Sequence, residues 1–203
     1  KRPVEEQQRL AFLHGRAAAE EQDFSQAVRA YGQAYQLSPS DLPTVMGLAQ
    51  SQFQLEDWEK AGKFFQILLV QHRDDLSPDE ITDTFYKLGR TKVQLSGRAE
   101  VGSDVATSER RKALNMFDKA LEQDSLHRPT LDALIELHEA EGEFEQVIHF
   151  KKQLLDVIDD DRRLPLLKEL ADIWQEKLNN PQKAIEFLSE AVDLAPQDHP
   201  TLH

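Results

Sequence analysis

Cysteine is absent from this 203-residue chain, and glycine and proline are scarce. Without cysteine the chain can form no disulfide, no thiolate metal site and no cysteine nucleophile. Eight glycines and nine prolines are too few for a protein built from many strands and tight turns. The longest apolar run, FFQILLV at 64–70, is far shorter than the ~20 residues that a membrane-spanning helix needs. We therefore expect a helical chain without a membrane-inserted segment.

Positive charge is in the minority as well. Lysine and arginine number 24 against 37 aspartates and glutamates, so the net charge is −13. A chain this acidic repels phosphate groups, which argues against nucleic-acid binding and against adhesion to anionic membranes. We expect no nucleic-acid partner. The lack of cysteine does not separate cytoplasm from periplasm, so we place the chain in the cytoplasm and leave a periplasmic location open.

The sequence does contain an internal repeat. Three stretches share an acidic residue, an aromatic residue and then Gln or Lys before a small apolar residue: EQDFSQAV at 21–28, LEDWEKAG at 55–62 and EGEFEQVI at 141–148. Each stretch precedes an amphipathic helical pattern of similar length. Ala27 and Ala61, which occupy matching places, are 34 residues apart. Self-similarity at a fixed period of this length indicates a stacked repeat architecture.

A 34-residue period with two helices per unit resembles the tetratricopeptide repeat family. The family motif has Gly or Ala in the first helix, then Ala, an aromatic residue and Ala in the second helix, followed by Pro. The first copy here carries Gly15, Ala27, Tyr31, Ala34 and Pro39. Matching residues of three further copies are Leu48, Ala49, Ala61, Phe65 and Leu68; Leu88, Gly89, Ala113, Phe117 and Ala120; and Leu170, Ala171, Ala184, Leu188, Ala191 and Pro196.

The fourth copy departs from this motif. Val147 stands at the alanine position, and Lys151 stands at the aromatic position with Phe150 beside it. Val147 and Ala184 are 37 residues apart rather than 34, so this step is also longer than the first. A small residue normally lets the two helices of a hairpin approach closely. We therefore expect looser helix pairing in the fourth repeat.

The pattern predicts an all-α, right-handed α-solenoid of five helix hairpins in a single domain over 1–203. Stacked hairpins bury a continuous core, because each unit covers the apolar face of its neighbour. The predicted repeats are 8–41, 42–75, 82–127, 128–161 and 164–198, and HPTLH at 199–203 looks like the opening of a truncated further repeat. The predicted helices are 4–20, 24–37, 41–54, 58–72, 78–95, 107–123, 128–140, 144–158, 163–177 and 181–194.

An insertion interrupts the third repeat. Gly89 and Ala113 are 24 residues apart, whereas the matching Gly15 and Ala27 are 12 apart. The twelve extra residues, near 96–107, fall between two helices of one repeat, so they mark no domain boundary. Two interpretations stay open: a solvated loop with one or both helices lengthened, or a contact loop for a partner. No GxxxxGK[ST] pattern accompanies its glycines, so phosphate binding is not indicated.

No pattern of catalytic or metal-binding residues emerges. His199 and His203 have a spacing that can hold a metal on a helix, but no third ligand lies in sequence reach. The acidic run Asp159, Asp160 and Asp161 lacks the alternation of a calcium loop. No nucleophile–base pair, carboxylate pair or cofactor motif is present. We therefore expect neither enzymatic activity nor a metal or cofactor.

The family resemblance implies a protein–protein interaction scaffold whose first helices line a concave groove. Along the matched register, the predicted groove residues are Arg9, Phe12, Arg16, Met46, Gln50, Tyr86, Lys87 and Arg90. Aromatic residues, Met and Arg anchor many interfaces, although Phe12 and Met46 could equally be part of the core. The matching positions further along are acidic: Asp132, Glu136, Glu139 and Asp172.

Two other functions stay open at this stage. The chain starts at Lys1 without a methionine, and we expect it to be a piece of a longer protein, so it could be the recruiting or regulatory arm of a larger enzyme. It could also be an assembly module that associates with itself. Ile185, Leu188 and Val192 on the last helix would lie open to water, which predicts weak end-to-end self-association. The identity of a protein or peptide partner is not encoded in any motif.

Overall fold

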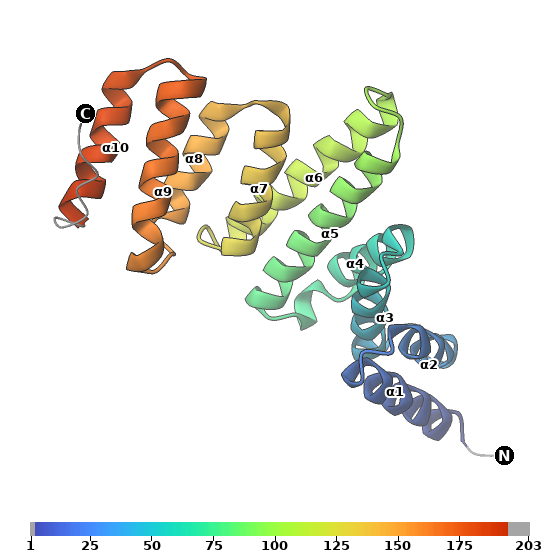
Figure 1. Cartoon of the computed structure of the whole chain (residues 1–203). Coiled ribbons are helices and arrows are strands. Elements are labelled where there is room, and N and C mark those ends of the chain that lie inside the picture. The colour runs from blue at the N-terminus through green and yellow to red at the C-terminus, as the bar shows by residue number, and fades with distance from the viewer. Residues whose placement is uncertain (1–2, 195–203) are drawn as a thin grey trace. The chain divides into compact units, whose positions relative to one another are not determined.

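The computed structural model describes residues 3–194, and within this range it contains ten α-helices and no strand. The chain divides into two compact units (Figure 1). The first unit, Lys1–Ser125, contains helices α1 to α6, and the second unit, Leu126–His203, contains α7 to α10. The division falls close to the predicted end of the third repeat at 127, so each unit consists of whole repeats. The single domain over 1–203 stays a prediction.

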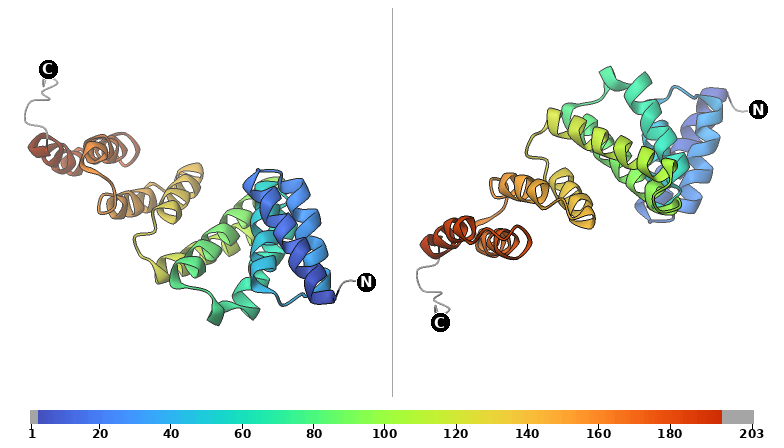
Figure 2. Two further views of the ribbon diagram at one scale, coloured as in Figure 1. Left: turned by 90° about the horizontal axis from the view of Figure 1, so that it is seen from below. Right: turned by 90° about the horizontal axis from the view of Figure 1, so that it is seen from above.

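Each unit is a row of antiparallel helix hairpins (Figures 1 and 2). The helices are α1 (Val4–Glu20), α2 (Phe24–Leu37), α3 (Leu42–Gln54), α4 (Trp58–Gln71), α5 (Pro78–Arg98), α6 (Asp104–Gln123), α7 (Arg128–Glu141), α8 (Phe144–Leu154), α9 (Asp160–Asp172) and α10 (Pro181–Leu194). A short 3-10 turn, Arg73–Asp75, follows α4, and a π-helical turn, Ile173–Lys177, follows α9. The all-α class and all ten predicted helices are confirmed. The predicted ends differ most in α8 and α9, where 158 becomes Leu154 and 177 becomes Asp172.

Side-chain caps explain why several helices begin where they do. Asp23 accepts a hydrogen bond from the backbone N–H of Gln26 at 2.9 Å, and so satisfies one of the free donors at the start of α2. At α5, the hydroxyl of Ser77 accepts from the N–H of Glu80, while the carboxylate of Glu80 accepts from the N–H of Ser77 at 2.8 Å. This reciprocal capping box, followed by Pro78, sets the start of α5.

The core of the first unit depends on aromatic rings that lie against glycines. A Cβ atom on Gly15 would lie 2.6 Å from the Tyr31 ring, and a Cβ on Gly47 would lie 2.5 Å from the same ring. The Tyr31 ring therefore fills the space between α1 and α3 so closely that a methyl group does not fit. The Phe117 ring stands in the same relation to Gly89, at 2.5 Å. These contacts explain the glycines of the repeat motif.

The insertion in the third repeat is mostly helical. Helix α5 extends to Arg98 and α6 begins at Asp104, three residues beyond the predicted end and three before the predicted start. Only residues 99–103 lie outside the two helices, and there Gly102 has φ +76°, a conformation that favours glycine. The twelve extra residues therefore lengthen both helices of one hairpin instead of forming a long loop.

The fourth hairpin is closed despite its unusual motif. Val147 is fully buried at the alanine position, and Ile148 beside it is buried as well. Phe150 stacks on the imidazole of His138 from α7, with ring centroids 5.6 Å apart and planes 17° apart. Larger side chains therefore fill the space that alanine occupies in other repeats, and looser pairing of α7 and α8 stays a prediction.

Candidate partner-binding surface

The first helices of the three N-terminal repeats form one continuous surface. The amide of Gln8 on α1 donates to the hydroxyl of Thr44 on α3 at 3.5 Å. The ammonium of Lys87 on α5 donates to the carbonyl of Gln50 on α3 at 2.6 Å. All eight predicted groove residues lie on α1, α3 and α5. We call the surface that these eight residues occupy the α1–α3–α5 surface.

The cationic side chains of this surface differ in how many ion pairs and hydrogen bonds they form within the chain. Arg9 is exposed, and the side chain of Arg16 is 59% exposed, with its Nε 3.6 Å from the carboxylate of Glu20. Lys87 is mostly covered and also forms a 2.7 Å ion pair with Asp83. Because Lys87 joins Gln50 and Asp83, its main structural effect is to hold α3 and α5 together. Arg9 and Arg16 are more accessible to a partner.

The apolar members of the surface also contribute to the core. The Phe12 ring lies 5.8 Å from the Tyr31 ring, centroid to centroid, and packs against the core cluster of the first hairpin. Met46 packs against the cluster that contains Val45. The Tyr86 ring lies 6.3 Å from the Phe117 ring. Each of the three side chains stays partly exposed, so each combines a packed base with an accessible edge.

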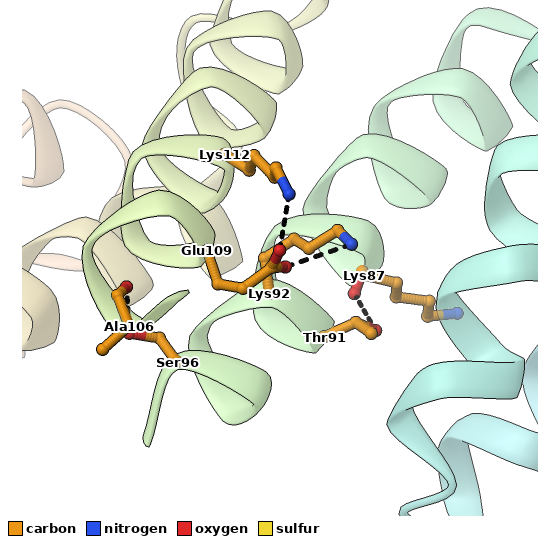
Figure 3. A network of polar contacts seen from close by, with 7 residues as sticks. All are labelled: Lys87, Thr91, Lys92, Ser96, Ala106, Glu109 and Lys112. Carbon is orange, nitrogen blue, oxygen red and sulfur yellow. Dashed lines mark hydrogen bonds and ion pairs between the residues drawn. The ribbon is translucent and has the colours of Figure 1, made fainter. Parts of the chain in front are cut away.

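A polar network at the base of the lengthened hairpin was not foreseen from the sequence. Glu109 on α6 pairs with Lys92 on α5 at 3.2 Å and with Lys112 at 2.6 Å (Figure 3). The hydroxyl of Ser96 donates to the carbonyl oxygen of Ala106 at 2.8 Å. The Lys92–Glu109 and Ser96–Ala106 contacts join α5 to α6 at the inserted residues and next to them. The available signal was Lys92, a charged residue at a position that is usually apolar.

Glu109 is more acidic than an ordinary glutamate. Burial raises the pKa of its carboxyl group, but hydrogen bonds and charges from Lys112 and Lys92 lower that pKa by more, so the net pKa is lowered. A lowered folded-state pKa contributes stability that is present above the unfolded-state pKa of about 4.3 and is lost as the pH falls through the folded-state value. The network should therefore weaken in acid.

We expect Glu109→Gln to lower the melting temperature most at neutral pH. The difference from the parent should shrink as the pH falls below about 4, because protonation then removes the same charge from the parent. Thermal unfolding followed by circular dichroism between pH 3 and 7 measures this difference. Glu100→Gln, at an exposed position near the hairpin tip, is the control. A difference that does not change with pH would contradict a stabilising role of the Glu109 charge.

The second unit has a buried lysine where the other repeats have an apolar side chain. The ammonium of Lys151 on α8 lies 3.2 Å from the carboxylate of Glu139 on α7 and 2.8 Å from that of Glu169 on α9. Its side chain is only 11% exposed. Burial lowers the pKa of Lys151, and the two carboxylates raise it by more, so the net pKa is raised. We call these three residues the Lys151 triad.

The described residues contain little that suggests other site chemistry. Within 3–194, no group of three or more histidines, aspartates and glutamates is arranged to hold a metal ion. His199 and His203 lie outside the described residues. No helix in the described range is long and apolar enough to cross a bilayer. Asp132, one of the acidic candidates, pairs with Arg128 at 3.6 Å on its own helix.

Comparison with known proteins gives matches in sequence and in fold. Residues 18–78 and residues 175–198 each match the tetratricopeptide repeat. No curated protein matches the chain in sequence. In fold the chain is similar to the crystal structure of MamA protein, with a TM-score of 0.67 and 13% identity, over 98% of this chain and 99% of MamA.

Two further solved structures have the same fold. YrrB, described as a TPR protein with an unusual peptide-binding site, has a TM-score of 0.59 and 18% identity over 91% of this chain and 84% of its own. TTC0263, a thermophilic TPR protein of Thermus thermophilus, has a TM-score of 0.57 and 18% identity over 94% of this chain and 93% of its own. Motif, hairpins and matches agree: residues 18–78 and 175–198 match the tetratricopeptide repeat in sequence, and the chain has the tetratricopeptide-repeat fold.

Proposed function

We propose that the chain is a protein–protein interaction scaffold in the cytoplasm that binds a partner segment on the α1–α3–α5 surface. The observation that carries this proposal is the surface itself. Helix α1 presents two accessible arginines and the Phe12 edge, α3 presents Met46 and Gln50, and α5 presents Tyr86, Lys87 and Arg90. The Gln8–Thr44 and Gln50–Lys87 contacts join the three helices. The fold likeness to YrrB, whose description includes a peptide-binding site, supports a binding role over a catalytic one.

The chemistry of the surface indicates the kind of partner. Arg9, Phe12 and Arg16 follow one another at helical spacing on α1, so two guanidinium groups flank one aromatic edge. Guanidinium groups bind carboxylates in a two-point geometry, and a half-buried aromatic ring supplies apolar contact. We therefore infer that the partner segment carries acidic and apolar residues.

Reversing two charges should weaken this binding without unfolding the chain. A partner captured with the parent chain and identified by mass spectrometry should bind Arg16→Glu/Arg90→Glu at least about tenfold more weakly, because like charges then face its acidic residues. The matched control is Arg29→Glu/Lys63→Glu, the same charge change at exposed positions on α2 and α4. Isothermal titration gives the affinities, and circular dichroism checks the fold. Unchanged affinity of the first double variant would disprove the assignment of the surface.

A separate observation favours weak self-association. Four apolar side chains on α10 are well exposed: Ile185 at 54%, Leu188 at 41%, Val192 at 49% and Leu194 at 45%. Covering such a face against a second copy would remove apolar surface from water at ~25 cal/mol per Å2, before the cost of association. We expect sedimentation velocity to show a concentration-dependent rise in mass, and Ile185→Glu/Leu188→Glu to remove it. A strict monomer at millimolar concentration contradicts this second proposal.

A further inference from the structure

We infer that the seam between α8 and the α9–α10 hairpin is a hinge that is held by charge instead of by close packing. This goes beyond partner binding and concerns how the second unit moves. The Lys151 triad lies at this seam, and an open cleft lies between α8, α9 and α10. Each of these features weakens a contact that normally fixes one repeat against the next.

The first argument is the side chain at the seam. At the matching position, Tyr31, Phe65 and Phe117 are buried rings. Tyr31 meets Gly47 of the next repeat so closely that no Cβ fits. Lys151 instead reaches Glu169 of the next repeat with a charged end at 2.8 Å. Thus an ion pair replaces an interlocked ring at this seam.

An ion pair tolerates movement that an interlocked ring does not. Dispersion contacts lose a quarter to a half of their energy when a gap opens by roughly 0.5–1 Å, whereas charge attraction falls off slowly with distance. Glu139 and Glu169 are also 45% and 56% exposed, so water can solvate them as the ion pair lengthens. The Lys151 triad therefore keeps the two hairpins together without specifying one narrow geometry.

The second argument is the cleft. A cleft of ≈ 380 Å3 lies between α8, α9 and α10. Its lining includes His149 and Lys152 on α8, Arg163 on α9, and Phe187 and Glu190 on α10. Because this space is open, side chains of α8 and α10 do not interlock there.

A hydrogen bond at the connection between the two hairpins supplies the pivot. The guanidinium of Arg163 at the start of α9 donates to the carbonyl oxygen of Leu155 just after α8, at 2.5 Å. This contact keeps the two helices joined at one end.

Spin-label distances test the hinge directly, and the cysteine-free chain allows labels at chosen sites. Cysteines replace Glu145 on α8 and Glu186 on α10 in the full chain, and the matched control pair is Ser25 on α2 and Lys63 on α4. All four positions are exposed, and in the repeat Glu145 matches Ser25 while Glu186 matches Lys63. We expect the 145–186 distance distribution to be at least about twice as wide as the 25–63 distribution. Equal widths would overturn the hinge.

Substitutions in the Lys151 triad provide a second test of the hinge. Lys151→Phe restores the ring of the other repeats and should narrow the 145–186 distribution toward that of the control pair. If Lys151→Phe does not fold, Glu139→Gln/Glu169→Gln provides the test. Removing the attraction of both carboxylates to Lys151 should widen the 145–186 distance distribution further. Circular dichroism confirms the helical content of each variant. A folded variant whose distribution equals that of the parent would show that the triad does not set the motion.

Discussion

Truncation of Phe117 to alanine should lower the free energy of unfolding of the first unit by about 3–5 kcal/mol, the usual cost of removing a fully buried ring. The Phe117 side chain is 0% exposed, and its ring lies against Gly89 where even a Cβ atom would come within 2.5 Å. The surrounding helices are therefore fitted to the ring. They cannot collapse fully into the space that its loss would leave, so the cavity cost adds to the lost burial.

Urea unfolding followed by tryptophan fluorescence measures the free energy of unfolding of the first unit. The chain has two tryptophans, Trp58 in the first unit and Trp174 in the second, so the Trp174→Phe background isolates the signal of the first unit. Val101→Ala is the control, because Val101 is 99% exposed at the hairpin tip and should change stability by less than about 0.5 kcal/mol. A Phe117→Ala cost under about 1 kcal/mol would contradict the packing described for this hairpin.

The second large effect concerns the charge of Lys151. Glu139→Gln/Glu169→Gln leaves a buried ammonium without its carboxylates, and we expect a loss of about 3 kcal/mol, the lower end for a buried ion that loses its partner. The lower end applies because both carboxylates are half exposed and partly screened by water. Lys151→Met removes the buried charge itself and should be nearly neutral, because an apolar side chain of similar length suits the site.

The Lys151 triad should also respond to alkali. The folded-state pKa of Lys151 is raised, so its contribution is fully present below the unfolded-state pKa of about 10.4 and is lost as the pH rises through the folded-state value. Above about pH 10.4, the free energy of unfolding of the parent should therefore fall relative to that of Lys151→Met. Trp174 fluorescence in a Trp58→Phe background measures both effects. If Lys151→Met lowers the free energy of unfolding as much as the double glutamine variant does, the unpaired buried charge is not the cause of the loss.

The repeat motif alone predicted most of the fold, because helix hairpins of this kind are specified by local patterns. Asp23 before one helix and Ser77 with Glu80 before another are start signals that can be read within four residues. The small residue Ala27 predicted a close approach of the two helices of the first hairpin, and it is fully buried there. All ten helices followed from such short-range patterns.

Part of the α1–α3–α5 surface could also be predicted, since helical spacing places Arg9, Phe12 and Arg16 on one face of α1. The contacts that each side chain makes on this surface could not be predicted. Lys87 was predicted as a groove cation, but the structure shows its ammonium held by Gln50 from α3 and by Asp83. Gln50 lies 37 residues earlier in the chain. A contact of this kind depends on how two repeats stack, so the local sequence pattern does not indicate it.

The repeat, the number and order of the helices and the family resemblance could be read from the sequence alone, because periodic burial and capping act between residues that are close in the chain. Only the tertiary structure decided that the inserted residues lengthen α5 and α6, that Glu109 joins them, and that Lys151 bridges α7 and α9. The physical reason is that electrostatic pairing and close packing depend on distances between separate helices. Those distances exist only once the hairpins have stacked.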